Sequence, residues 1–223
     1  MSARSRRTAA LGAGVVVAGA ALLSPLNALA HELFSAHMVQ HLLLMLAAAP
    51  LVVYGMPAVG RTALGKLPAV PAWARSALLV GIVHGAVIWL WHLPGPYQAA
   101  IENHGLHAAE HLTFFGTALA FWALVIGGPS GRRLGHPAAA ALVLFTAAHS
   151  GALGAILSFA SRGLYPVHSG GAAAVGLTLL EDQQLAGAIM WIPAGAVYLI
   201  TIVVLMVRAL SALEKAGLEG AAQ

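Results

Sequence analysis

Several long apolar segments constrain this chain more than any other feature of its sequence. Each runs for about 20 residues with few charged side chains, the length that an α-helix needs to cross a bilayer. The composition agrees, because 60% of the residues are hydrophobic and only 8% are charged, whereas soluble domains carry roughly 25% charged residues. The sequence therefore predicts an all-α, polytopic transmembrane bundle, and its net charge of +4 does not indicate nucleic-acid binding.

Five spans are predicted after the N-terminal segment, at residues 34–54, 73–92, 106–126, 137–160 and 185–207. Short connections rich in Pro and Gly, such as LPGPY and SRGLYPVHSGG, join them. Connections of this length predict antiparallel neighbours within one domain, at residues 31–210. Residues 211–223 then form a short cytoplasmic tail.

The first 30 residues are either a signal peptide or a sixth span. Three arginines precede an apolar run that ends in the triplet Ala-Leu-Ala at 28–30. That ending slightly favours cleavage, and Pro25 and Asn27 also suit a cleavage region better than a helix end. Both alternatives carry His31 to the outer face, so the orientation of the remaining spans is the same.

The basic residues predict that orientation. Ten of the eleven fall on one side of the predicted spans, and only Arg162 falls on the other. Because Lys and Arg accumulate in cytoplasmic loops, the ten mark the cytoplasmic side of a bacterial inner membrane. They are Arg4, Arg6, Arg7, Arg61, Lys66, Arg75, Arg132, Arg133, Arg208 and Lys215.

The histidines concentrate at the opposite side. The chain has 11 histidines but only seven acidic residues, and all histidines except His136 lie in or above the outer half of the predicted bilayer. His37 and His41 are four residues apart, on one helix face, and His107 and His111 repeat this spacing on another span. Two such pairs at a similar depth could surround a common centre that faces the periplasm or exterior.

Metal binding suits these residues. Neutral imidazole is a good ligand for Cu, Zn, Fe and Ni, thioethers favour Cu(I), and copper leads the divalent affinity series. The chain has no cysteine, so thiolate sites and disulfides are excluded. The predicted ligands are His37, His41, His107, His111, His92, His84, Met38 and Met190. Glu110, Glu181, Asp182 and His149 are predicted to orient the imidazoles or to accept their protons.

Simpler interpretations remain open for many of these residues. An isolated histidine near a membrane interface, such as His31, His104 or His168, more often forms a hydrogen bond than binds a metal. His149 could bond a neighbouring helix, and the Glu181-Asp182 pair could begin a helix. Methionines are more often core residues than ligands.

Four ordered motifs resemble one known family. HMVQHLLLMLAAAPLVVYG, WLWHLPGPYQAAI, HAAEHLTFFGTALAFW and LEDQQLAGAIMWIPAGAVYL are similar to the CtaG-type cytochrome c oxidase assembly factors. Together they extend over most of residues 37–207, and one departure is that Pro50 stands alone where the family usually has two prolines. The resemblance carries over to His37, Met38, Gln40, His41, Trp91, His92, Pro94, His107, Glu110, His111, Glu181, Asp182, Gln183, Met190 and Trp191.

The resemblance implies a role in the maturation of a haem–copper oxidase, through copper supply and without catalytic turnover. The implied partners are the oxidase subunits, a copper donor protein on the outer side and membrane lipid. Three alternatives stay open: a protein that binds haem without a covalent link, a copper or proton transporter, and an assembly partner that binds no metal. The transporter is the weaker alternative, because the inner halves of the spans carry almost no polar side chains.

Overall fold

The computed structural model describes residues 2–56, 76–127 and 133–221, and these residues form helices without any strand. Among the described residues, five helices are long and apolar enough to cross a membrane, or six if one bent pair counts as a span. The predicted fold class is therefore confirmed. The predicted start of the second span at Trp73, and the basic residues Arg61, Lys66, Arg75 and Arg132, lie outside the described residues.

The N-terminal part consists of a long helix, a short helix and an interrupted span. Helix α1 (Ala3–Leu23) ends at Ser24, whose hydroxyl accepts a bond from Leu26 N and so begins α2 (Pro25–Glu32). The next span contains α3 (Phe34–Leu42), a π-helical segment η1 (Leu43–Ala48) and α4 (Ala49–Gly55). Pro50 has no N–H to donate, and the wider π turn before it accommodates the interruption.

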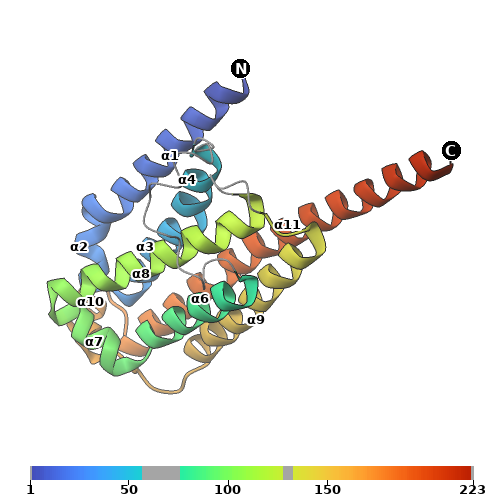
Figure 1. The fold of residues 1–223 in the computed structure, drawn as a ribbon. Helices are drawn as coiled ribbons and strands as arrows, with labels where there is room; N and C mark the ends of the chain where they lie inside the picture. The colour runs from blue at the N-terminus through green and yellow to red at the C-terminus, as the bar shows by residue number, and fades with distance from the viewer. Residues whose placement is uncertain (1, 57–75, 128–132, 222–223) are drawn as a thin grey trace.

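Helix α1 packs closely against α4 (Figure 1). An added Cβ at Gly14 would lie 2.8 Å from Val52 Cγ2, and one at Gly55 would lie 2.7 Å from Arg7 O. Glycines at these two positions therefore allow the two backbones to approach, as small residues do between membrane helices.

The central helices include a sharp bend. Helix α6 (Ala77–Trp91) meets α7 (Pro94–Glu102) at 72°. Leu93 is extended, as expected before a proline, and Pro94 begins the new helix. The predicted connection LPGPY thus contains the bend, and from Pro94 on it is helical. Helix α8 (His104–Trp122) follows and continues into the π-helical segment η3 (Ala123–Gly127).

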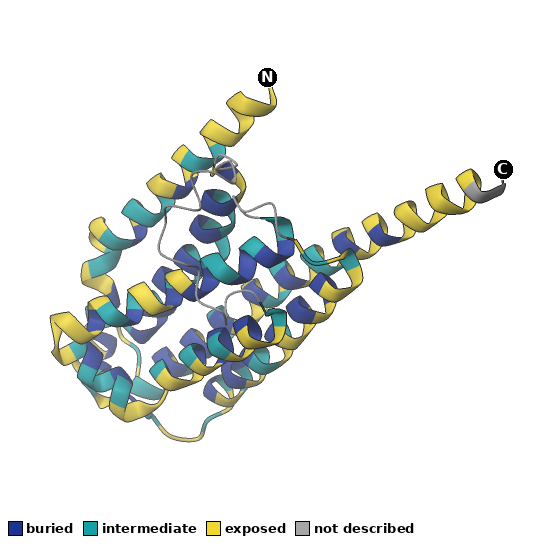
Figure 2. Ribbon diagram, viewed as in Figure 1, coloured by how far each residue is buried: buried dark blue, intermediate teal, exposed yellow. Residues whose placement is uncertain are grey.

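The C-terminal part pairs two long helices. Helix α9 (His136–Ser158) packs along α11 (Leu179–Ala221), with Gly154 and Gly187 at their close approach. Between them lie η4 (Pro166–His168) and α10 (Ser169–Ala174). Helix α11 has 43 residues and extends far beyond the packed bundle, where its surface is exposed (Figure 2). In Figure 1, α2, α7 and α10 lie at the end of the molecule away from both termini.

Candidate metal centre

The two predicted histidine pairs face each other across α3 and α8. The ring centroids of His37 and His107 are 5.4 Å apart, and those of His41 and His111 are 5.3 Å apart. Within each helix the two ring centroids are closer, 4.2 Å apart on α3 and 4.3 Å apart on α8. All four residues lie within the first two or three turns of their helices, so the structure brings both pairs together at one depth.

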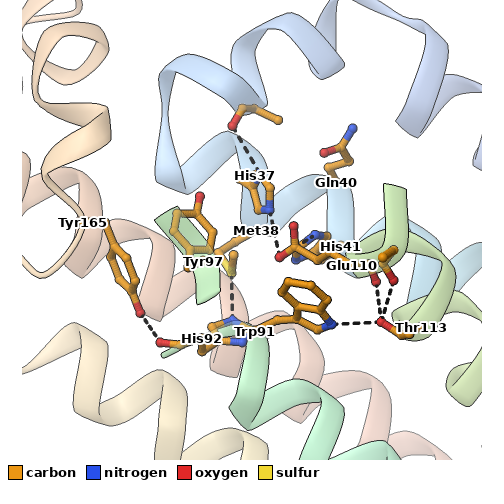
Figure 3. A network of polar contacts seen from close by, with 12 residues as sticks. His37, Met38, Gln40, His41, Trp91, His92, Tyr97, Glu110, Thr113 and Tyr165 are labelled. Carbon is orange, nitrogen blue, oxygen red and sulfur yellow. Dashed lines mark hydrogen bonds and ion pairs between the residues drawn. The ribbon is translucent and has the colours of Figure 1, made fainter. Parts of the chain in front are cut away.

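Glu110 supplies a carboxylate to this group. Its Oε1 lies 3.5 Å from His37 Nε2 and 3.8 Å from His41 Nε2, and its side chain is almost fully buried (Figure 3). The name "imidazole centre" is used below for His37, His41, His107, His111 and Glu110. Two overlapping triads in it hold their ligand atoms within 4.8 Å of one another: His37, His41 and His111, and His37, His107 and Glu110.

The imidazole centre is rich in buried polar atoms that have no hydrogen-bond partner among the described residues. These are His37 Nε2, His41 Nδ1 and Nε2, His107 Nε2, His111 Nε2 and both oxygens of Glu110. Each such atom costs roughly 1–3 kcal/mol when it stays unpaired. A cation bound among them would satisfy most of them at once, so this donor set fits a metal ion.

His37 is held in an orientation that suits a ligand. Its Nδ1 lies 3.2 Å from Ala30 O, and because a carbonyl only accepts, Nδ1 carries the proton. The lone pair of Nε2 is then directed at the centre. A backbone carbonyl that receives the other ring N–H is a common support for metal-binding histidines. The sequence did not predict this role of Ala30, because the bond depends on how α2 folds back over α3.

Asp182 supports the same helix from a distance. Its two oxygens accept bonds from Phe34 N at 2.8 Å and Ser35 N at 3.1 Å. Leu33, the residue before α3, offers no side-chain cap, so Asp182 satisfies the free N–H groups at the start of that helix. The structure thus places Asp182 against the backbone of α3 rather than against an imidazole.

Met38 and His92 lie beside the imidazole centre and contact each other. Met38 Sδ is 3.4 Å from His92 Nε2, and both side chains are buried. Figure 3 shows this contact next to His37 and His41. Phe114 packs against both His41 and His92.

The other predicted residues lie elsewhere. His84 contacts Thr117 Oγ1 at 2.9 Å and stacks on Phe121. Both partners lie about two to three turns beyond His111 in α8. His149 packs against Gly85. Met190 belongs to the apolar core. Glu181 is exposed and forms a capping box with Thr178 at the start of α11.

Two tyrosines near the centre were missed by the sequence analysis. The ring of Tyr97 lies 5.1 Å from that of His37, and its hydroxyl forms a hydrogen bond of 2.7 Å with His168 Nε2. Tyr165 donates to His92 O at 2.7 Å. Burial lowers the pKa of His168, which favours the neutral ring. No local pattern signals these contacts, since the partners are about 70 residues apart.

Gln40 has a structural role that its position in the first motif did not indicate. Its amide donates to Ala21 O at 2.8 Å and to Asn27 Oδ1 at 2.9 Å. Ala21 lies in the last turn of α1, where carbonyls lack helical partners. Gln40 therefore joins α3 to the end of α1.

Comparison with known proteins identifies one family. No curated protein and no solved structure gives a significant match. The sequence profile described as "cytochrome c oxidase caa3 assembly factor" matches residues 2–212, nearly the whole chain. The residues that build the imidazole centre all lie inside the match, and the chain belongs to the family of cytochrome c oxidase caa3 assembly factors.

Proposed function

We propose that this protein assists oxidase assembly by holding copper at the imidazole centre and releasing it to an oxidase subunit. The observation that carries the proposal is the convergence of seven buried, unpaired polar atoms from four histidines and one glutamate. Imidazole and carboxylate donors without thiolate suit copper among the metals that a respiratory oxidase needs. To deliver copper, the protein must bind and release the ion without catalysing a reaction.

The position of the centre supports delivery on the outer side of a bacterial inner membrane. The centre lies near the first turns of α3 and α8, whereas Arg133 follows the far end of α8 and Arg208 lies far along α11. Because basic residues favour the cytoplasm, the first turns of α3 and α8 then face outward. A copper donor protein on that side would be the source of the metal.

The close packing of the rings disfavours haem between α3 and α8. Ring centroids across the two helices are 5.3–5.4 Å apart for two of the pairs, which leaves no room for a flat macrocycle between them. A copper ion needs far less space, because metal–nitrogen bonds of about 2 Å fit inside such a cluster.

The experiment is a metal analysis of two double variants. The protein is expressed with added copper and purified in detergent, and Cu, Zn and Fe are quantified. We expect near-stoichiometric copper that His37→Ala/His41→Ala loses. The control His104→Ala/His136→Ala removes the same number of imidazoles, from an exposed position and from the start of α9, and should keep its copper.

Three outcomes would decide against the proposal. Well-folded wild-type protein that binds no copper would favour a purely structural assembly partner. Iron with a Soret band would favour haem. Copper that survives in His37→Ala/His41→Ala would place the metal elsewhere. In cells, the proposal also requires that oxidase copper falls while the variant still accumulates in the membrane.

A further inference from the structure

The contact between Met38 and His92 is not an ordinary hydrogen bond. His92 Nδ1 lies 2.7 Å from Ile88 O, and since a carbonyl can only accept, Nδ1 carries the ring proton. In a neutral imidazole, Nε2 then has a lone pair and no hydrogen. A thioether also has no hydrogen to donate. Two acceptors therefore face each other at 3.4 Å.

A second proton on His92 would not resolve this contact. It would create a charge on a side chain that is only 5% exposed, and buried charges are costly unless they are paired. In the described part of the chain, the Glu110 carboxylate lies within 4 Å of His37 and His41 and makes no such contact with His92. The neutral ring with a free Nε2 is thus the consistent state.

His92 and Met38 are both held in place by other parts of the fold. Tyr165 donates to His92 O and fixes the end of α6. On the other side, Asp182 fixes the start of α3, the helix that carries Met38. The two acceptors consequently face each other because the surrounding structure positions them.

We propose that Met38 and His92 form a soft subsite for monovalent copper beside the imidazole centre. The inference rests on the proposed function, because it takes copper as the metal. With bonds of about 2.0 Å to nitrogen and about 2.3 Å to sulfur, two ligands of a tetrahedral ion lie roughly 3.5 Å apart, close to the observed separation. Thioether and imidazole together favour Cu(I) over harder ions.

The subsite and the imidazole centre then differ in the metal ions that they prefer. The imidazole centre has nitrogen and carboxylate donors, which also accept Zn²⁺ and Cu²⁺. Met38 supplies the sulfur. His41 is the candidate third ligand, since neither of its ring nitrogens has a partner and its ring packs on Phe114, which also contacts His92. A site with only a few strong ligands suits an ion that must be released again.

The experiment measures how tightly two metal ions bind to the wild type and to three variants of the full-length protein in detergent. Ag⁺ serves as the redox-stable probe for monovalent copper, and Zn²⁺ serves as the probe for the imidazole centre. Met38→Leu keeps the volume and removes the sulfur. Met45→Leu is the matched control, because Met45 is also buried in the same span. His37→Ala/His41→Ala tests the imidazole centre.

We expect Met38→Leu to weaken Ag⁺ binding by about tenfold or more and to leave Zn²⁺ binding unchanged. Met45→Leu should change neither. His37→Ala/His41→Ala should abolish Zn²⁺ binding and also weaken Ag⁺ binding strongly, because it removes the candidate third ligand His41. Equal Ag⁺ affinity in Met38→Leu and wild type would overturn the subsite while leaving the proposed function intact. Failure of the wild type to bind either metal would overturn both.

A spectroscopic measurement does not depend on how well the variant folds. X-ray absorption of wild-type protein loaded with Cu(I) should show a sulfur neighbour at about 2.3 Å together with nitrogen neighbours. Met45→Leu should give the same spectrum, and Met38→Leu should lose the sulfur neighbour. A wild-type spectrum without sulfur would by itself overturn the inference.

Discussion

Glu110 places a carboxyl group in the interior of a membrane protein. Its side chain is buried among imidazoles, and neither oxygen has a hydrogen-bond partner in the described part of the chain. A carboxylate in this position is costly, so side chains of this kind in membranes usually mark a functional site. We attribute to Glu110 a share in metal binding, because four neutral imidazoles alone leave the charge of a bound cation uncompensated.

The first prediction concerns Glu110→Gln, which keeps the shape and removes the charge. Metal affinity should fall roughly 10- to 100-fold, while thermal stability in the absence of metal should stay equal or increase. Equilibrium dialysis with Zn²⁺ and a thermal unfolding curve measure the two effects. Glu102→Gln is the control, because Glu102 is exposed and accepts a bond from Gln98. Unchanged affinity in Glu110→Gln would exclude the carboxylate from the site.

The second prediction concerns pH and His168. Burial lowers the pKa of this ring, so between the unfolded value near 6.5 and the lower folded value the unfolded chain binds a proton that the folded chain does not. The free energy of unfolding therefore has its full value above pH 6.5. It decreases as the pH falls, by at most about 1.4 kcal/mol per pH unit from this residue.

The comparison with His168→Gln isolates this effect from that of the other buried histidines. Glutamine can still accept the Tyr97 hydroxyl, but it does not titrate. Unfolding temperatures measured from pH 7.5 to 5.5 should decrease more steeply for the wild type than for the variant. Parallel curves would mean that folding does not lower the pKa of His168.

At the scale of helices, two termini decide where the ligands point. The start of α3 depends on Asp182 from α11, and the start of α11 depends on its own Thr178–Glu181 capping box. The two adjacent acidic residues thus have different roles. One stabilises its own helix, and the other reaches across to the helix that carries His37 and His41.

The third prediction separates these roles. Asp182→Ala removes two hydrogen bonds to buried backbone N–H groups and should destabilise the protein by roughly 2–3 kcal/mol. It should also lower metal affinity, because the first turn of α3 loses its anchor. Glu181→Ala should affect only the start of α11 and leave metal affinity unchanged. Thermal unfolding and Zn²⁺ binding test both variants, and equal metal affinities would show that α3 is held without Asp182.

At the scale of the whole molecule, the sequence could predict what repeats locally and could not predict what meets across the fold. Apolar length gave the spans, and i,i+4 spacing gave each histidine pair. The sequence could not show that Ala30 O would receive His37, or that Asp182 would meet Phe34, since these contacts depend on packing between distant segments. The helix after Pro94 could not be predicted either, because proline both ends and begins helices.

The packing of residues 2–32 on the bundle bears on whether this segment is retained in the mature protein. Helix α1 meets α4 closely, and the segment supplies Ala21 O to Gln40 and Ala30 O to His37. These contacts connect the segment directly to the helix of the imidazole centre. We therefore expect changes in α1 to affect both stability and metal binding.

The fourth prediction tests this with two glycines of α1. Alanine stabilises an open helical position by about 1 kcal/mol relative to glycine, so Gly19→Ala, where an added Cβ meets nothing within 4 Å, should raise the unfolding temperature. Gly14→Ala should lower it, because the same Cβ would lie 2.8 Å from Val52 Cγ2 and 2.9 Å from Val52 N. Thermal unfolding together with the intact mass of the purified chains gives the answer. Equal shifts in both variants, or a mass that lacks the first 30 residues, would mean that the mature centre is built without α1 and α2.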